Sequence, residues 1–311
     1  MIYVIINPYS SSGRSQKIWE EHKALFLECH GAHDVVYTDG KNDATFLAQK
    51  ALKNGYTWII AFGGDGTVNE VINGFYENEI LINKEAVLSV IMNGTGCDFQ
   101  RSFSNCLSVK EQIEGLQKAE NTKLDLIKII DADKKVRYCN NITSIGLGSY
   151  VSALVNESKY IHFLKKINGT FAFFVASFVA LLRFRNRHFN IKIDNDETMN
   201  IKAKEIVIAN GKYYGGGMKI APDAELFSRK LEMIIIGDIS LWSFILHNKK
   251  LYRGEHLALP KIERKAVKNL FIDSAHPLSL QVDGENFGSI AAHLSVVESA
   301  INFKIPLTNV D

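Results

Sequence analysis

Cysteine is scarce in this sequence, and the few cysteines present are not arranged for a common role. Cys29, Cys97, Cys106 and Cys139 are scattered, and no two of them form a Cys-x-x-Cys pair. This scatter argues against a disulfide framework and against a zinc knuckle. Because disulfides are rare in reducing compartments, a chain without them fits a cytoplasmic protein, which is what we expect here.

Long apolar runs are missing as well. The longest candidate, Phe171 to Leu182, is shorter than the roughly 17 residues that a transmembrane helix needs. The first residues are apolar, but they lack the basic flank and the cleavage site of a secretory signal, so we expect none. Hydrophobic residues make up 46% and charged residues 23% of the 311, which excludes a wholly disordered, collagen-like or coiled-coil chain.

The net charge is only +2, but it is divided unevenly along the chain. Residues 1–124 carry 11 basic and 15 acidic side chains, whereas residues 125–311 carry 25 and 19. A mildly basic second part could face an anionic membrane surface, and we expect peripheral membrane association. A chance imbalance on a solvated surface is the alternative.

Residues 1–124 alternate short apolar runs with helical patterns. The patterns predict strands at 2–6, 34–38, 58–62 and 86–92, and helices at 15–29, at 43–52, after Gly66 and around 109–116. Strand–helix alternation of this kind is typical of an α/β domain with a parallel sheet.

From about residue 125 the pattern changes to short strands with two helices between them. We expect a hairpin of 125–131 and 136–145, helices at 169–183 and 241–250, and strands at 189–193, 205–209, 230–236, 270–274, 279–282 and 300–305. These segments predict an antiparallel β-domain with inserted helices over residues 125–311. The last residues either complete this domain or return to the first one.

A glycine-rich loop is the strongest chemical signal in the sequence. Gly63-Gly64-Asp65-Gly66-Thr67 follows an apolar strand and opens a helix. Adjacent glycines allow close approach to the backbone, and free N–H groups at a helix N-terminus favour phosphate oxygens. Asp65 would repel phosphate unless it held a cation or accepted a proton, so the loop predicts a phosphate site with a metal or acid–base role. A tight turn with Asp65 as a helix N-cap is the alternative.

This loop matches none of the standard phosphate-binding motifs. Gly-x-x-x-x-Gly-Lys-Ser/Thr is absent, Asn69 stands where the dinucleotide fingerprint needs its third glycine, and protein-kinase signatures are absent. Two more loops, Asn7 to Gly13 and Asn93 to Phe99, follow other strands of the same predicted sheet. Because open α/β sheets bind ligands at the C-terminal ends of their strands, the three loops together predict one nucleotide-sized pocket.

Two motifs stand out in the second part. Gly215 to Gly217 form either a flexible turn or a place where a ligand meets the backbone. Asp283-Gly284-Glu285 follows an apolar strand, and Asp-Gly is a favoured hairpin turn. The two carboxylates could also ligate Mg²⁺ or accept a proton from a hydroxyl group.

Together these motifs resemble those of the bacterial diacylglycerol kinase-like lipid kinases, which are relatives of sphingosine kinases. The resemblance extends over nearly the whole chain through the order of Asn7-Pro8, Thr38, Gly63 to Gly74, Gly94-Thr95-x-x-Asp98-Phe99-x-Arg101, Ile145-Gly146, Asn210-Gly211, Gly215 to Ala224, Gly254-x-His256 and Val282 to Glu285. It implies an ATP-binding α/β domain of the NAD kinase and phosphofructokinase type over 1–124. It also implies a β-sandwich lipid-substrate domain over 125–311, with the active site in the cleft between the two.

The resemblance further implies transfer of the γ-phosphate of ATP, bound with Mg²⁺, to a lipid hydroxyl at a membrane surface, as part of phospholipid metabolism. Glu285 matches the family's proton acceptor, and Asp65 would organise Mg²⁺–ATP or assist deprotonation nearby. Asp283 is a further candidate as a metal ligand. The positions that would hold ATP are Asn7, Ser10, Ser11, Thr38, Gly63, Gly64, Asp65, Gly66, Thr67, Val68, Asn69 and Thr95.

Two stretches depart from the family's pattern. Asn93 and Cys97 replace a proline and an asparagine around Gly94-Thr95. Phe227-Ser228-Arg229 stands where the family has Asp-Asp-Gly or Asn-Asp-Gly, and in many members that aspartate holds a structural Mg²⁺. Because serine is a poor ligand for a hard cation and an arginine would repel it, we predict that this metal site is lost at Ser228 or replaced by a salt bridge.

The apolar helix predicted at 169–183 ends in a run of arginines, Arg183-Phe184-Arg185-Asn186-Arg187. Such a helix could lie at a membrane interface or line an acyl-chain tunnel. It could equally be a core helix whose terminal cations complement its dipole.

Two other functions fit parts of the sequence. A soluble small-molecule kinase such as an NAD kinase would tolerate the N-terminal motifs, but not the glycines at 215–217 or the 282–285 motif. A non-catalytic nucleotide-binding regulatory module would explain the altered stretch at 227–229, but not the intact Asp65 and Glu285.

The lipid acceptor is open. The candidates are diacylglycerol, monoacylglycerol, phosphatidylglycerol, a sphingoid base and a ceramide. A homodimer is an open alternative, and no nucleic acid partner is expected.

Overall fold

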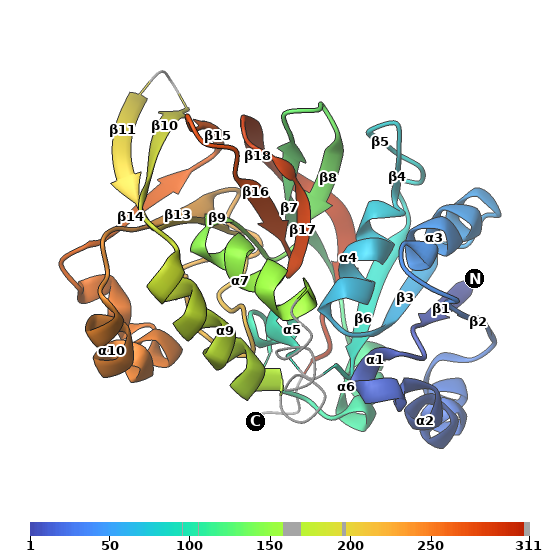
Figure 1. Ribbon diagram of the computed structural model, residues 1–311. Helices are drawn as coiled ribbons and strands as arrows, with labels where there is room; N and C mark the ends of the chain where they lie inside the picture. Colours follow the sequence, from blue (N-terminus) through green and yellow to red (C-terminus); the bar gives the residue numbers. More distant parts are fainter. Residues whose placement is uncertain (95, 105, 158–168, 195–196, 308–311) are drawn as a thin grey trace. The chain divides into compact units, whose positions relative to one another are not determined.

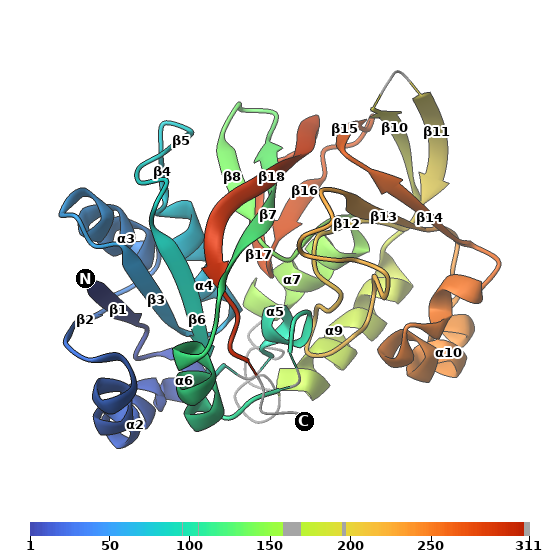
Figure 2. The ribbon, with the colours of Figure 1, turned by 180° about the vertical axis from the view of Figure 1, so that it is seen from behind.

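The computed structural model describes residues 1–94, 96–104, 106–157, 169–194 and 197–307. The chain divides into two compact units (Figures 1 and 2). The first comprises Met1–Asp125 with Glu298–Asp311, and the second comprises Leu126–Val297. None of the helices in the described ranges is long and apolar enough to cross a membrane.

The first unit contains a parallel sheet in the order β2-β1-β3-β6-β18. Its strands are β1 (Ile2–Ile6), β2 (His33–Tyr37), β3 (Trp58–Gly63), β6 (Val87–Met92) and the end of β18 (Ala292–Lys304). All four neighbouring pairs are parallel. The near-continuous apolar runs of these strands fit a sheet that is covered on both faces. The predicted α/β domain is therefore confirmed.

Helices cover both faces of this parallel sheet (Figures 1 and 2). Trp19 and Phe26 of α2 and Ile113 of α6 are buried against Ile6 and Phe62 of the sheet. On the other face, α3 and α4 pack against each other and against β1 and β3. The elements of this unit outside the sheet are α1 (Ser10–Gly13), α2 (Ser15–His30), α3 (Asp43–Lys53), α4 (Asp65–Asn73), β4 (Tyr76–Glu77), β5 (Ile80–Leu81), α5 (Asp98–Arg101) and α6 (Val109–Gln117).

The second unit is a β-sandwich. A six-stranded antiparallel sheet has the order β14-β13-β12-β9-β16-β17, and the facing sheet contains β11-β10-β15-β18 with β7 and β8. Ile145, Ile208 and Met233 of the first sheet share one buried core with Phe189 and Ile272 of the second. The strands are β7 (Asn121–Ile130), β8 (Val136–Cys139), β9 (Ile142–Gly146), β10 (Arg187–Ile193), β11 (Glu197–Ala203), β12 (Glu205–Ala209), β13 (Leu231–Ile236), β14 (Ile262–Val267), β15 (Asn269–Asp273), β16 (Ser279–Val282) and β17 (Glu285–Ser289).

The helices in the described part of the second unit are α7 (Leu147–Glu157), α9 (Gly169–Arg183), α10 (Leu241–Arg253) and the 3₁₀ helix η1 (Glu255–Ala258). Helix α9 packs against α7, with Ala176 and Ala180 fully buried beside Val151. The burial of these two alanines agrees with the alternative that the helix at 169–183 belongs to the core. The side chains at 156–174, including the phenylalanines at 171, 173 and 174, lie outside the described part.

The structure corrects the predicted hairpin of 125–131 and 136–145. Residues 136–145 form two strands in different sheets: β8 pairs with β7, whereas β9 pairs with β12 and β16. The change of sheet occurs at Asn140 and Asn141, whose backbone N–H groups donate to the buried carboxylate of Asp283. Strands β11, β14 and β17 and helix α7 were not predicted, and β18 begins at Ala292 rather than at 300.

Candidate functional site

Three loops at the ends of β1, β3 and β6 meet in the first unit. Asn7 Nδ2 donates a hydrogen bond of 2.9 Å to Thr67 Oγ1, and Ser10 Oγ donates one of 3.2 Å to Asn93 Oδ1. Gly64 and Gly94 approach so closely that a Cβ atom on Gly94 would lie 2.8 Å from Gly64 Cα. Because these strands are parallel neighbours, their loops share one edge of the sheet.

The other predicted nucleotide-binding residues have different surroundings. Thr38 follows β2 and is buried, and its N–H donates to the Ile6 carbonyl at 2.9 Å. Val68 and Asn69 of α4 are 0% and 1% exposed, and their part in nucleotide binding stays a prediction. Ser11 lies in α1 in a left-handed conformation, with a φ of 53°. Thr95 lies outside the described residues.

Asp65 is the first residue of α4, and its carboxylate is turned toward the start of α5. Gly64 is the N-cap of α4, so the alternative of Asp65 as the N-cap is wrong. Instead, Oδ1 accepts a hydrogen bond from the Phe99 N–H at 2.9 Å, and Oδ2 accepts one from the Asp98 N–H at 3.3 Å. Burial raises the pKa of Asp65, while these hydrogen bonds and the positive charge of Arg101 act in the opposite direction.

Two carboxylates of the first unit flank Gly96. A Cβ atom on Gly96 would lie 3.4 Å from Asp65 Oδ2 and 3.7 Å from Asp98 Oδ2. Mg²⁺ is usually bound by one or two carboxylates together with substrate phosphates and water. Within the described ranges, no group of three or more His, Cys, Asp or Glu side chains could form a complete protein cage. The pair therefore fits a Mg²⁺ ion that arrives with phosphate oxygens.

In the second unit, Asp283 and Gly284 form the turn between β16 and β17. Both residues have positive φ, 46° and 90°, as the favoured Asp-Gly hairpin turn requires. Asp283 is enclosed by the loop between β8 and β9. Its Oδ1 accepts from the backbone N–H groups of Ile142 at 2.9 Å and Asn141 at 3.2 Å, and its Oδ2 accepts from that of Asn140 at 3.1 Å.

These partners give Asp283 a structural role. The Cys139 thiol donates the fourth hydrogen bond to this carboxylate, and it is the third to Oδ1, at 3.2 Å. Burial raises the pKa of Asp283, and the hydrogen bonds from Ile142, Cys139 and Asn140 oppose this shift. A carboxylate whose oxygens already accept four hydrogen bonds is poorly placed to ligate an ion, so the geometry does not support the metal role considered for Asp283.

Glu285, two residues later, has a more open environment. Its side chain is 30% exposed, and Oε2 lies 3.2 Å from Nη2 of Arg137. The guanidinium group of Arg137 also lies over the Phe287 ring, 5.7 Å from its centre. Arg137 thus fixes one oxygen of Glu285. Asp65 belongs to the first unit and Glu285 to the second, so the proximity of the two carboxylates stays a prediction.

The three successive glycines form a tight loop. Gly215, Gly216 and Gly217 have φ values of 63°, 84° and 103°, a conformation that side-chain-bearing residues rarely adopt. Tyr214 and Met218 close the loop with two backbone hydrogen bonds of 3.0 Å. This arrangement presents both residues to a pocket in the second unit.

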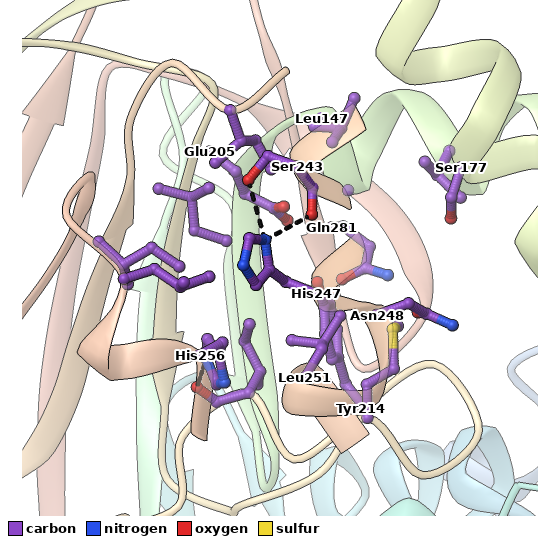
Figure 3. Close-up of a pocket in the computed structure, with 18 residues that line it drawn as sticks. Leu147, Ser177, Glu205, Tyr214, Ser243, His247, Asn248, Leu251, His256 and Gln281 are labelled. Carbon is purple, nitrogen blue, oxygen red and sulfur yellow. Dashed lines mark hydrogen bonds between the residues drawn. The ribbon is translucent and has the colours of Figure 1, made fainter. Parts of the chain in front are cut away.

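This pocket is the feature that the sequence motifs did not locate (Figure 3). Its lining residues come from β12, β13, β14, β16, α7, α9, α10 and η1 and from the loops between them. Ser177 of α9 is among the lining residues, as is His247 of α10, whose Nδ1 lies 2.9 Å from the Ser243 carbonyl. The apolar lining residues are Leu147, Val151, Met218, Ile220, Ile236, Ile239, Leu251, Leu259 and Ile262. The sequence signals near it were the glycines at 215–217 and the apolar helix that carries Ser177.

The stretch 227–229, which departs from the family's metal motif, is held by hydrogen bonds of Ser228, and ion pairs join residues before and after it in the sequence. Ser228 Oγ lies within hydrogen-bonding distance of two carbonyl oxygens, those of Glu225 at 3.0 Å and Lys230 at 3.1 Å. Arg264 pairs with Asp223, and its Nε lies 3.6 Å from Glu232 Oε2. The absence of a structural metal at Ser228 stays a prediction.

A parallel α/β unit with glycine-rich loops, followed by a β-sandwich unit, defines a kinase of the NAD kinase-like architecture. A family model described as the diacylglycerol kinase catalytic domain matches residues 1–129, and one described as the YegS C-terminal NAD kinase beta sandwich-like domain matches residues 141–304. The diacylglycerol kinase of Staphylococcus epidermidis is 30% identical over 304 residues, covering 97% of this chain and 91% of that protein. The Staphylococcus aureus diacylglycerol kinase is 30% identical over 305 residues, with the same coverage.

Solved structures show the same fold. A crystal structure of a diacylglycerol kinase from Bacillus anthracis superimposes with a TM-score of 0.72 at 18% identity, covering 98% of this chain and 96% of that one. Yeast NADH kinase complexed with NADH is more distant, with a TM-score of 0.55 at 12% identity, covering 99% of this chain and 84% of that one. The chain belongs to the diacylglycerol kinase family and is a lipid kinase that uses a nucleotide.

Proposed function

We propose that this protein transfers the γ-phosphate of ATP to the hydroxyl group of a diacylglycerol or a related lipid. The observation that carries the proposal is the pocket of the second unit, which is lined by nine apolar side chains. Burying apolar surface stabilises binding by about 25 cal/mol per Å², so such a pocket favours an acyl chain over a water-soluble acceptor. The same argument disfavours an NAD kinase activity.

The loops of the first unit supply the phosphate site in this proposal. The backbone N–H groups at the start of α4, around Gly64 to Thr67, are oriented for phosphate oxygens, and the glycines leave room for them. Asp65 and Asp98 would hold the Mg²⁺ that accompanies ATP. When bound, this ion neutralises the charge of the phosphates.

Glu285 serves as the general base. It accepts the proton of the lipid hydroxyl while the hydroxyl oxygen forms a bond to the γ-phosphorus, and the bond from that phosphorus to the bridging oxygen of ADP breaks. The ion pair with Arg137, at 3.2 Å from Oε2, orients the carboxylate that takes the proton. General-base assistance of this kind contributes about 10²–10⁴-fold to a rate.

The proposal is tested by transfer of labelled γ-phosphate to a panel of lipids and to NAD, with wild type and Asp65→Asn in parallel. We expect a labelled lipid from wild type and a rate at least about 100-fold lower from Asp65→Asn, because the amide weakens both the cation site and the anchor of α5. Thermal unfolding with and without ATP separates loss of fold from loss of transfer. Labelling of NAD alone, or nucleotide binding without labelling of any lipid, would overturn the proposal.

We also propose that α9 and α10 meet the membrane surface. Leu246 of α10 is 74% exposed and Leu182 of the neighbouring α9 is 63% exposed. Lys249, Lys250 and Arg253 follow on α10, and each basic residue near an anionic surface contributes about 1 kcal/mol. We expect cosedimentation with phosphatidylglycerol-containing vesicles that decreases severalfold in Leu246→Glu. Equal sedimentation of both proteins, or equal sedimentation with purely phosphatidylcholine vesicles, would contradict this.

A further inference from the structure

Several polar side chains that line the apolar pocket are already engaged by the protein. The carboxyl group of Glu205 is buried, and its hydrogen-bond partners are Ser144 and Gly148. Gln281 accepts at Oε1 from a serine hydroxyl at 3.3 Å and donates from Nε2 to another at 2.9 Å. His256 donates from Nε2 to a backbone carbonyl at 3.0 Å, and its Nδ1 is buried. These groups hold the walls of the pocket together.

The ring of His247 lies inside the pocket and has one nitrogen in use (Figure 3). Its Nδ1 lies 2.9 Å from the Ser243 carbonyl oxygen and 3.3 Å from the Ser243 hydroxyl oxygen. A carbonyl oxygen only accepts hydrogen bonds, so Nδ1 carries the ring proton and donates it. In a neutral imidazole the other nitrogen, Nε2, is then an acceptor. A hydrolytic serine–histidine pair is excluded, because the nitrogen that faces the hydroxyl already carries a proton.

The acceptor Nε2 of His247 is open to a ligand. It has no hydrogen-bond partner in the described part of the chain, and it is not among the buried atoms of that part that lack one. The residue as a whole is half-buried. Aliphatic side chains around it offer no donor, so a ligand that brings a hydroxyl or N–H group gains a hydrogen bond. A few such polar atoms in an apolar pocket determine which ligand fits and how it is oriented.

The candidate lipids differ in the donors that they can offer to this nitrogen. The one hydroxyl of a diacylglycerol is consumed by the proposed reaction, and its ester groups only accept. An ester oxygen at Nε2 would bring two acceptors together. A monoacylglycerol has the same reacting hydroxyl and a second, free hydroxyl that can donate.

We infer that His247 selects a monoacyl lipid with a free hydroxyl group in addition to the reacting one, by accepting a hydrogen bond from that hydroxyl at Nε2. The inference rests on the proposed lipid acceptor and narrows its class. His247 is then a residue that determines specificity, and it takes no part in the transfer of the phosphate itself.

The test is calorimetric binding of two lipids to the full chain without ATP, at about pH 8, where imidazole groups are ordinarily neutral. The lipids are 1-octanoylglycerol and the octanoyl ester of 1,3-propanediol, which lacks only the 2-hydroxyl. His247→Phe keeps a ring of similar shape and removes Nε2. The affinity for the first lipid divided by that for the second should fall about three- to tenfold in this variant, which corresponds to one net hydrogen bond. Dioctanoylglycerol, which has no spare donor, should lose no affinity.

His22→Phe is the matched control. His22 makes the same bond from Nδ1 to the carbonyl four positions earlier, at 2.8 Å from Ile18, but it belongs to α2 of the first unit and is not among the described residues that line the pocket. It should leave the ratio of affinities unchanged. Ser243→Ala removes a hydroxyl from the pocket but keeps the carbonyl that holds Nδ1, so the ratio should persist there as well.

An unchanged ratio in His247→Phe would overturn the inference, as would an equal loss of affinity for dioctanoylglycerol. A loss of the ratio in Ser243→Ala would assign the contact to the serine hydroxyl and contradict the role of His247. Thermal unfolding checks that each variant is folded. Because binding is measured without ATP, its failure is distinct from failure of the proposed function, which would appear as absent phosphate transfer to any lipid.

Discussion

Glu285→Gln is expected to fold and to bind ATP like the wild type, yet to transfer phosphate about 100- to 1,000-fold more slowly. Glutamine has nearly the shape of glutamate but cannot accept the hydroxyl proton. The loss of the ion pair with Arg137 has a small effect on stability, because the Glu285 side chain is 30% exposed and partly exposed pairs contribute at most about 1 kcal/mol. The measurement is the rate of label transfer from γ-labelled ATP to diacylglycerol.

The matched control is Glu263→Gln, the same chemical change at an exposed position on β14 of the same unit. It should leave both the rate and the midpoint of thermal unfolding unchanged. If Glu285→Gln turned over as fast as this control, the assignment of Glu285 as general base would be wrong. If it failed to bind ATP, its effect could not be assigned to proton transfer.

Asp283→Ala is expected to have the opposite profile, with a loss of stability rather than a specific loss of transfer. The variant leaves the N–H groups of three buried residues, Asn140, Asn141 and Ile142, without their acceptor. Each unsatisfied buried donor costs about 1–3 kcal/mol, so the free energy of unfolding should fall by at least about 3 kcal/mol. Equilibrium denaturation in urea measures this directly.

Asp283→Asn serves as the control for this change. Asparagine tolerates the left-handed conformation of the turn and keeps one oxygen for Asn141 and Ile142, so an intermediate loss of stability is expected. A metal role would give a different result. Mg²⁺ would then stabilise the wild type, and Asp283→Ala would remove that increment while its metal-free stability stayed unchanged.

The strands and helices of the first unit were predictable because their information is local. The apolar run 58–62 and the glycines after it define β3 and the start of α4 without reference to any distant residue. The predicted boundaries of β1, α2 and α3 agree with the structure to within one residue. The second unit was less predictable, since the short strands of a sandwich are defined by their partners. Strand β14 lies at the edge of its sheet and is only partly covered. Its buried and exposed residues therefore show little of the strict alternation that identifies a strand.

The candidate site, like the fold, could be predicted from the sequence only in part. The sequence could identify Asp283 and Glu285 as a pair of carboxylates, but not their different surroundings. The loop that encloses Asp283 comes from residues 139–142, about 140 positions earlier in the chain. Glu205 carried no motif at all. It stands out only through its burial and its contacts with Ser144 of β9 and Gly148 of α7.

By itself, the sequence determined the parallel α/β unit, the glycine loops at the ends of its strands and membership in the lipid kinase family. Those features depend on local periodicity, on backbone freedom at glycine and on the order of short motifs. The tertiary structure decided that 136–145 divides between two sheets, that Asp283 holds a turn, and that an apolar pocket encloses a single buried carboxyl group. Burial and hydrogen bonding between distant segments create these features, and no local pattern of residues encodes them.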